Sequence, residues 1–209
     1  MAPKVSEEHR DSKRALIIEA AKRVFIRQGY ERTTMKDVVE EAGLSRGGVY
    51  LYFSSTEEMM LAIIDEADKL NFRDFTLLYE QYGSLWKALE QLFELNTQGI
   101  EQLAQTIVPV FIEFHILSWR NGKHAQYTAE RYERSLQYVV SLLNKGVEQG
   151  EFRPIVPVTA IAQMFISFHD GMFIGVLQLG MKKSGALEQI DALKRSIRYL
   201  LQVQNEERG

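Results

Sequence analysis

The chain has 209 residues, enough for one or two domains, and its 45% hydrophobic content excludes a disordered chain. It contains no cysteine, which excludes disulfides, thiol nucleophiles and cysteine-ligated zinc sites. The net charge is −3, but residues 1–36 hold nine basic and five acidic residues, a balance of +4, so the remaining 173 carry −7. A basic end on an acidic body is typical of a protein that presents one face to phosphate, although a chance fluctuation explains it equally well.

The first part of the chain predicts four helices, over about residues 12–28, 35–42, 45–53 and 56–79. Gly29 and Gly43 supply the left-handed residues that commonly end the first two helices. Ser45 is placed to cap the third. Ser55 and Glu58 predict a capping box at the start of the fourth, in which each satisfies an exposed backbone N–H of the other.

The rest of the chain predicts helix after helix, without strand-like alternation, repeats or low-complexity tracts. The expected segments cover about residues 84–104, 106–121, 125–149, 157–181 and 186–204. We therefore expect an all-α protein, in which the fourth helix joins a three-helix head to a larger helical body.

One segment has the length and low charge of a membrane span. Between Arg153 and Lys182 the only formal charge is Asp170. The segment also holds Gln163 and His169, and such polar groups are costly at mid-depth in a bilayer. A buried helix at an oligomer interface explains the same residues better, and we expect no membrane association.

The segment Thr34–Phe53 has the pattern of a helix-turn-helix. Two short helices that cross steeply need a residue that tolerates positive φ between them, and Gly43 fills that position. Apolar residues occupy the positions where the helices touch, namely Val38, Ala42, Leu44, Val49 and Tyr52 or Phe53. Such hairpins also occur in helical proteins that do not bind DNA, so the spacing favours DNA binding without requiring it.

A longer stretch resembles the N-terminal domain of the TetR family of bacterial regulators. The resemblance is carried by TTMKDVVEEAGLSRGGVYLYFSSTEEMM and by the helix before it. It implies a DNA-binding domain over residues 10–70, with the helix-turn-helix at about 34–53, and a helical ligand-binding and dimerisation domain over 71–209. The chain departs from the family pattern at Thr56, where a lysine is usual, and at Leu51, where a polar residue is common.

The candidate DNA contacts are Thr34, Lys36, Ser45, Arg46, Gly47, Gly48, Tyr50, Tyr52 and Thr56, with Lys13 and Arg14 as further phosphate candidates. Thr34 and Ser45 begin helices, where a hydroxyl and free N–H groups favour phosphate. Arg46 is suited to bidentate readout of guanine, although it can equally hold a phosphate. The adjacent glycines allow close approach to the groove. Tyr52 either offers its hydroxyl to the DNA backbone or packs in the core.

The last two predicted helices carry the candidate dimer interface, at Ser167, Gly171, Gly175, Leu193, Ile197 and Leu200. The small residues Ser167, Gly171 and Gly175 recur every four positions on the helix predicted over 157–181, which lets another helix approach closely. In the resembling family the corresponding helix and the last helix pair with their copies in a four-helix interface. A homodimer would match two heads to a palindromic operator in double-stranded DNA. A monomeric core explains the apolar stripe of the last helix equally well.

The body is rich in aromatic residues, and the candidate ligand contacts are Phe93, Phe111, Phe114, His115, Trp119, Phe168, His169 and Met172. Family members commonly bind an inducer in this body, so the resemblance implies an apolar or aromatic small molecule. For any single residue, ordinary core packing is the alternative. Glu113, His115, His169 and Asp170 are the polar groups that such a ligand could meet.

We find no pattern that nominates a catalytic site, a metal site or a cofactor. The chain has no phosphate-binding glycine loop and no HExxH motif. The N-terminus lacks the features of a secretory signal, so we expect a cytoplasmic location. We predict a DNA-binding transcriptional regulator, acting as a dimeric repressor that a small molecule releases from its operator.

Overall fold

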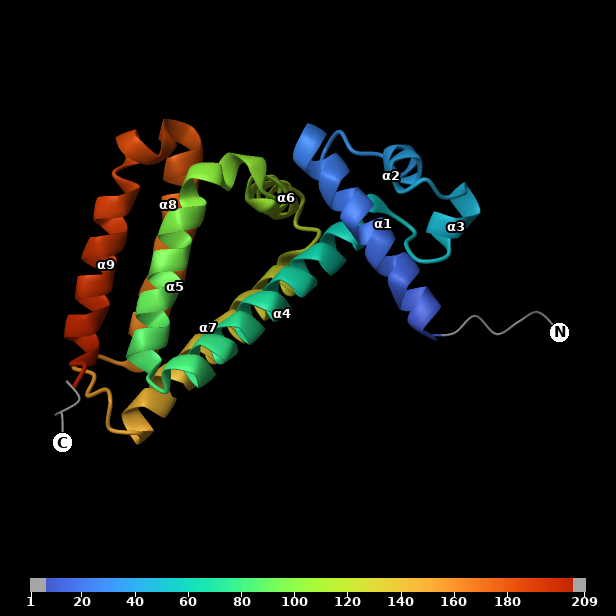
Figure 1. The fold of residues 1–209 in the computed structure, drawn as a ribbon. Helices are drawn as coiled ribbons and strands as arrows, with labels where there is room; N and C mark the ends of the chain where they lie inside the picture. Colours follow the sequence, from blue (N-terminus) through green and yellow to red (C-terminus); the bar gives the residue numbers. More distant parts are fainter. Residues whose placement is uncertain (1–6, 205–209) are drawn as a thin grey trace. The chain divides into compact units, whose positions relative to one another are not determined.

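The computed structural model describes residues 7–204, and within this range it is helical without strands, which confirms the predicted all-α class (Figure 1). The elements are α1 (Glu7–Gln28), α2 (Met35–Ala42), α3 (Arg46–Tyr50), α4 (Thr56–Tyr82), α5 (Leu85–Gly99), the 3-10 helix η1 (Ile100–Gln105), α6 (Val108–Asn121), α7 (Ala125–Glu148), α8 (Val158–Ser184) and α9 (Ala186–Leu201).

The chain divides into two compact units. The first comprises Met1–Lys69 with Gln105–Lys123, and the second comprises Leu70–Ala104 with His124–Gly209. Helix α6 therefore belongs to the same unit as the helix-turn-helix, although it lies within the range 71–209 that the resemblance assigns to the C-terminal domain.

The first unit is built around one face of α1. Its buried apolar side chains come from α1, α2, α3, α4 and α6 and from the turn after α3, and they include Ile17, Ala21, Val24, Phe25, Val38, Val49, Phe53, Met60, Ile64 and Phe114. These residues recur at helical spacing, so each helix presents one apolar stripe to a shared core. The opposite faces of α2 and α3 are left exposed.

Most helix ends in the first unit follow the sequence, but α1 begins at Glu7, before the predicted start near residue 12. Gly29 and Gly43 adopt φ of +84° and +63°, as predicted. Helix α3 is shorter than expected because the chain turns after Tyr50 and brings Phe53 into the core. At the start of α4 the N–H of Glu58 donates to Ser55 as predicted, at 3.1 Å.

The other half of that capping box was predicted at the wrong residue. The Glu58 carboxylate accepts hydrogen bonds from the N–H and the hydroxyl of Ser54, at 2.7 and 2.9 Å. Ser54 thus offers two donors, its N–H and its hydroxyl, to one carboxylate oxygen of Glu58.

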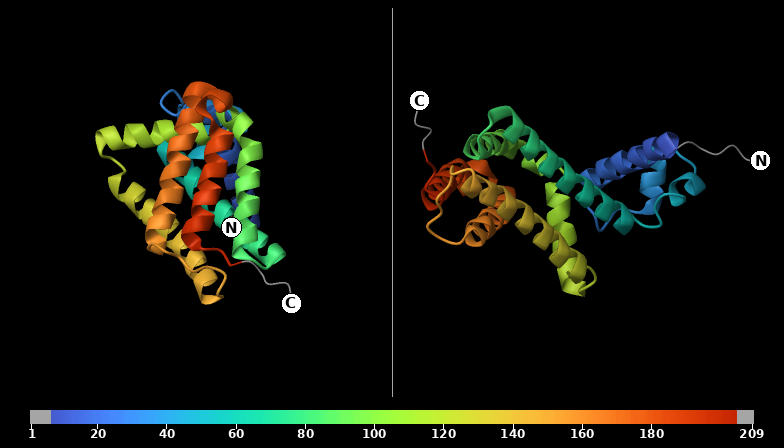
Figure 2. Two further views of the ribbon diagram at one scale, coloured as in Figure 1. Left: turned by 90° about the vertical axis from the view of Figure 1, so that its left-hand side faces the viewer. Right: turned by 90° about the horizontal axis from the view of Figure 1, so that it is seen from below.

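The second unit is a helical bundle. Helix α8 packs against α7 and α9, and α5 packs against α9 and α7; α5, α8 and α9 lie side by side in Figure 2. The apolar stripe of α9 is buried within this bundle, at Ile190, Leu193, Ile197 and Leu201. Helix α8 is long and apolar enough to cross a membrane, and only 22% of its most apolar window is buried in the chain.

Candidate nucleic-acid interface

The start of α2 is held by a reciprocal pair of side chains. The Thr34 hydroxyl accepts from the backbone N–H of Asp37 at 3.3 Å. In return the Asp37 carboxylate accepts from the Thr34 N–H at 2.8 Å and from its hydroxyl at 2.7 Å. These bonds lower the pKa of Asp37, because they favour the charged carboxylate. The predicted phosphate contact of Thr34 must therefore compete with Asp37 for the same hydroxyl proton.

Helix α3 has a buried side and an exposed side. Val49 is fully buried and Phe53, just beyond the helix, is 2% exposed, so both anchor α3 to the core. Ser45 caps the helix by accepting from the N–H of Gly48 at 3.1 Å. On the exposed side, the Arg46 guanidinium lies over the Tyr50 ring, 5.1 Å from its centroid. The exposed side of this short helix therefore presents an arginine and a tyrosine, and an arginine can donate paired hydrogen bonds to the edge of a guanine.

The two glycines of α3 differ in what surrounds them. A Cβ added at Gly47 would meet no atom within 4 Å, whereas one at Gly48 would lie 3.2 Å from the Ser45 hydroxyl oxygen. Neither glycine needs a positive φ. The fold itself therefore does not require glycine at position 47. Without a side chain there, nothing projects from the exposed side of α3 at this residue.

A small cavity of about 180 Å³ lies beside α3. It is lined by His9 and Lys13 of α1 and by Leu44, Ser45, Gly48, Leu51 and Tyr52. Tyr52 is half-buried here, between the two alternatives that its sequence position left open. His9 was missed by sequence reasoning, because nothing local indicates that the first turns of α1 reach α3. Leu51 is 75% exposed.

Much of the positive charge on α1 is matched by carboxylates. Arg23 and Arg27 both pair with Glu41 of α2, at 2.7 and 3.0 Å, and these hydrogen bonds lower the pKa of Glu41. On α2, Lys36 lies 3.6 Å from Glu40 in a solvent-exposed pair. The basic character of residues 1–36 is thus only partly available to DNA.

Thr56 is the first residue of α4 and is half-buried. The next residue, Glu57, pairs with Lys123, which follows α6. A hydroxyl beside this ion pair stands where the resembling family usually has a lysine, so this end of α4 carries less positive charge than the family pattern implies.

Helix α6 is attached to the turn that leads into α2. The Glu113 carboxylate accepts from the backbone N–H groups of Tyr30 and Glu31, at 2.8 and 3.0 Å. The Tyr30 ring also packs edge-on against Phe114, with centroids 4.9 Å apart. Sequence reasoning marked Glu113 as a polar group near a ligand; the structure shows it capping a turn of the helix-turn-helix unit.

The predicted ligand contacts fall into two groups. Phe111, Phe114, His115 and Trp119 belong to the first unit; Phe93, Phe168, His169 and Met172 belong to the second. Phe114 is buried, whereas Trp119 is 82% exposed. In the second unit, His169 lies against Phe168 and Phe165, and Phe165 in turn packs against Phe93.

His169 is a half-buried histidine with two hydrogen-bond partners. One ring nitrogen lies 3.0 Å from the Asn96 amide and the other 3.2 Å from the carbonyl oxygen of Phe165. Burial lowers the pKa of this imidazole, because the charged form is poorly solvated there. It is therefore neutral at physiological pH, with one nitrogen as donor and the other as acceptor.

The predicted dimer residues differ in exposure. Ser167 and Gly171 of α8 are exposed, while Gly175 and Leu200 are half-buried. Leu193 and Ile197 are only 6% and 3% exposed, because the stripe of α9 packs within its own unit. The exposed apolar side chains of these helices are others, namely Ile174, Leu179, Leu187 and Tyr199.

Within residues 7–204 no group of three or more acidic or histidine side chains is placed to hold a metal ion.

Comparison with known proteins gives matches along most of the chain. Residues 17–63 match the family described as bacterial regulatory proteins, tetR family, and residues 88–186 match the tetracyclin repressor-like C-terminal domain. The chain is 41% identical to the uncharacterized HTH-type transcriptional regulator YfiR of Bacillus subtilis, over 97% of this chain and 98% of that protein.

One further relative and one solved structure are less similar to the chain in sequence. The chain is 26% identical to the HTH-type transcriptional repressor KstR2 of Mycobacterium tuberculosis, over 72% of this chain and 74% of that protein. The structure of a SmeT–triclosan complex superposes with a TM-score of 0.67 at 16% identity, covering 93% of each chain.

Proposed function

The chain belongs to the TetR family of bacterial transcriptional regulators, and we propose that it acts as a homodimeric repressor that a small molecule releases from a palindromic operator. The observation that carries the DNA-binding part is the exposed side of α3, where Arg46 and Tyr50 lie on a helix anchored by Val49 and Phe53. Residues 10–70 form the proposed DNA-binding domain, and residues 71–209 the proposed ligand-binding and dimerisation domain.

In this proposal α3 enters the major groove and Arg46 reads a guanine. Gly47 and Gly48 let the helix backbone approach the groove. Contacts to the phosphates come from the remaining candidates, Thr34, Lys36, Ser45, Tyr50, Tyr52 and Thr56. Because Glu41 offsets part of the charge of Arg23 and Arg27, the specific contacts supply a larger share of the affinity than a broad charged surface would.

Dimerisation is proposed through α8 and α9. The low burial of α8 leaves Ser167 and Gly171 open to close approach by a second helix, with Ile174 and Leu179 exposed farther along the same helix. Leu193 and Ile197 serve the core of the unit, so α9 contributes its exposed Leu187 and Tyr199 instead. A partner helix on α8 accounts for its apolar composition without a membrane, and we place the protein in the cytoplasm with its DNA.

An aromatic or apolar inducer is supported by the aromatic content of the chain and by the triclosan complex of a protein with the same fold. The aromatic group around His169 offers an apolar wall and a neutral imidazole, a combination typical of ligand sites. The residues of the first unit predicted to contact ligand adjoin Glu113, which reaches the turn before α2. Binding of the inducer would shift the population towards head positions that do not fit the operator.

Selection of bound sequences from random DNA tests the DNA-binding proposal directly. We expect a palindrome, with half-sites about one helical turn apart. On the selected site, Arg46→Ala should weaken binding by about tenfold to a hundredfold, as expected for loss of a bidentate base contact. Arg73→Ala is the matched control, because Arg73 is an exposed arginine of α4 in the second unit.

Equal losses for the two arginine variants would contradict the role of α3, and a selected site without symmetry would contradict the dimer. Inducer release is measured on the same DNA by titrating aromatic compounds. If no compound changes the operator affinity, the proposed release by a small molecule is contradicted, whereas the proposed DNA binding is not.

A further inference from the structure

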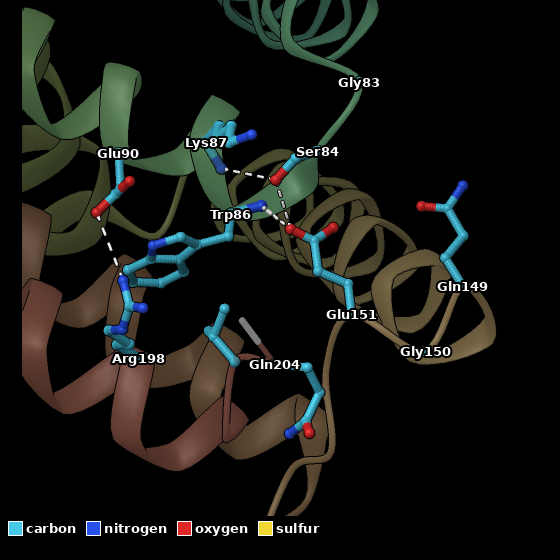
Figure 3. A pocket seen from close by; sticks show the side chains of 11 residues that line it. Gly83, Ser84, Trp86, Lys87, Glu90, Gln149, Gly150, Glu151, Arg198 and Gln204 are labelled. Carbon is cyan, nitrogen blue, oxygen red and sulfur yellow. Dashed lines mark hydrogen bonds and ion pairs between the residues drawn. The ribbon is translucent and has the colours of Figure 1, made fainter. Parts of the chain in front are cut away.

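Two cavities differ in whether the chain itself satisfies the groups that line them. In the cavity of about 540 Å³ in the second unit, Glu151 accepts from the Ser84 hydroxyl at 2.6 Å (Figure 3). Glu90 lies 3.8 Å from Arg198 in the same cavity, so both carboxylates already have partners. The cavity of about 180 Å³ beside α3 instead has an apolar wall, to which Leu51 contributes. The surface that the chain leaves open there is apolar, and it lies on the helix proposed to bind DNA.

Leu51 is the most exposed large apolar side chain among the described residues of α1 to α3 and the turns that join them. It is 75% exposed, against 45% for Leu16 of α1. Single exposed apolar side chains are ordinary on protein surfaces, so the exposure alone assigns no role. What distinguishes Leu51 is its position on α3.

Leu51 stands on the side of α3 that points away from the core. The helical hydrogen bonds continue past the end of α3, from the Leu51 N–H to the Gly47 carbonyl and from the Phe53 N–H to the Val49 carbonyl, both at 3.1 Å. Val49 and Phe53 are the buried anchors of this segment. Each residue of a helix lies about 100° further round the axis, so Leu51, two residues from each anchor, lies about 160° from both. Leu51 is therefore the side chain turned most directly towards a groove that α3 enters.

The neighbours of Leu51 on this side of α3 are glycines. Gly47, one helical turn earlier, is exposed, and Gly48 is half-buried. Arg46 and Tyr50 lie to one flank, with the guanidinium over the ring at 5.1 Å from its centroid. The centre of the exposed side is thus apolar, and the groups that can form hydrogen bonds to bases stand beside it.

The edges of the base pairs in the major groove limit what a leucine can recognise. They present hydrogen-bond donors and acceptors, which need a polar side chain, and thymine also presents its C5-methyl group. An isobutyl side chain forms no hydrogen bonds, so the methyl group is the one of these features that it matches. Contact between the two would remove apolar surface from water on both sides.

We propose that Leu51 reads thymine, by packing against the C5-methyl group of one thymine in each half-site of the operator. Gly47 leaves room for the base edge, because no side chain projects between it and the helix. The inference rests on the proposed DNA binding through α3. It adds an A·T pair to the guanine assigned to Arg46, so each half-site carries two recognised positions.

The test uses the full-length protein and the palindrome that it selects from random DNA. The thymines of the palindrome are replaced by 2′-deoxyuridine, one symmetric pair at a time; deoxyuridine pairs with adenine in the same way and lacks only the methyl group. Affinities are measured by fluorescence anisotropy at one fixed salt concentration, because binding to DNA depends strongly on salt. The variants are Leu51→Ala and Leu77→Ala. The second is the matched control, since Leu77 is a 53% exposed leucine of α4 in the second unit.

We expect one thymine position per half-site at which the replacement weakens binding by the unmodified protein. The loss should be about fourfold for each methyl group and about fifteenfold for the symmetric pair, as expected for burial of one methyl group. Leu51→Ala should bind the thymine operator more weakly and should no longer distinguish thymine from uracil at that position. Leu77→Ala should keep the full difference. Selection with Leu51→Ala should return a palindrome that has lost the A·T pair and kept the guanine.

The proposal is overturned if no thymine replacement weakens binding, or if Leu51→Ala keeps the full difference between thymine and uracil. It is also overturned if Leu51→Ala weakens binding to both operators equally, because Leu51 would then contact another part of the DNA. In each of these cases the unmodified protein still selects a palindrome, so the proposed DNA binding stands. A protein that selects no DNA sequence overturns both proposals.

Discussion

Glu113 and Tyr30 are joined although 83 residues separate them: the carboxylate accepts the Tyr30 backbone N–H at 2.8 Å. The same carboxylate accepts the next N–H, that of Glu31, at 3.0 Å. The Tyr30 ring is partly buried beside Phe114, and burial, with the nearby charges of Glu57 and Glu113, raises the pKa of its hydroxyl to about 12. One side chain of α6 thus closes the turn that starts the helix-turn-helix.

Replacing Glu113 should destabilise the first unit. Glu113→Ala leaves two backbone donors without their charged acceptor, so we expect a loss of about 1–3 kcal/mol in the free energy of unfolding. Glu113→Gln keeps one acceptor oxygen and should lose less. Chemical denaturation measures both, with the exposed Glu80→Ala of α4 as a control expected to change stability by less than about 0.5 kcal/mol. A Glu113→Ala protein as stable as this control would show that the turn does not need the carboxylate.

Substitutions at the two glycines of α3 should affect stability and DNA binding differently. Gly47→Ala meets no neighbouring atom, so it should leave stability unchanged or raise it by up to about 1 kcal/mol. The added methyl group stands on the exposed side of α3 and should weaken operator binding by about tenfold, equivalent to about 1.4 kcal/mol. Denaturation and gel-shift titration of one preparation measure the two effects.

Gly48→Ala is the companion variant. Its Cβ would lie 3.2 Å from the hydroxyl oxygen that caps the helix, so the gain in stability should be smaller or absent. If Gly47→Ala bound the operator as tightly as the unmodified protein, α3 would not approach the groove closely at that residue.

Thr34 and Asp37, the capping pair of α2, should contribute to the free energy of unfolding, and the contribution of Asp37 should depend on pH. Thr34→Ala should cost about 1 kcal/mol, while Thr34→Ser keeps the hydroxyl and should cost less. The folded pKa of Asp37 is lower than its ordinary value of 3.8, so its contribution is complete above that value and is lost as pH falls through the folded pKa. Asp37→Asn should flatten the acid limb of stability below about pH 4. An unchanged acid limb would rule out this contribution.

His169 should make the second unit less stable in mild acid. Its folded pKa lies below 6.5, so the unfolded chain takes up a proton first as pH falls. The contribution of the neutral imidazole is complete above 6.5 and declines as pH falls towards the folded pKa, by at most about 1.4 kcal/mol per pH unit. Unfolding curves at several pH values give the free energy of unfolding as a function of pH. Its slope in mild acid should be smaller for His169→Gln than for the unmodified protein, with His9→Gln as the control. A slope shared by both variants and the unmodified protein would exclude His169 as its source.

Local signals in the sequence were enough to locate the helices and the helix-turn-helix. Thr34, Gly43 and Ser45 act within a few residues of their own positions, through caps and a left-handed turn, so their patterns can be recognised without knowledge of the fold. For the same reason α2 spans the predicted residues, and the exposed side of α3 was predicted from its spacing.

Long-range packing decided the features that couple distant parts of the chain. The sequence shows Glu113 as one more acid on an apolar helix, and nothing near it indicates a bond to a turn 83 residues away. Leu193 and Ile197 have the spacing of an interface and of a core alike, and they are core because α9 packs within its own unit. Trp86 likewise gives no local sign that its N–H lacks an acceptor. Such outcomes depend on which surfaces meet, and helical periodicity leaves the partner of each face unspecified.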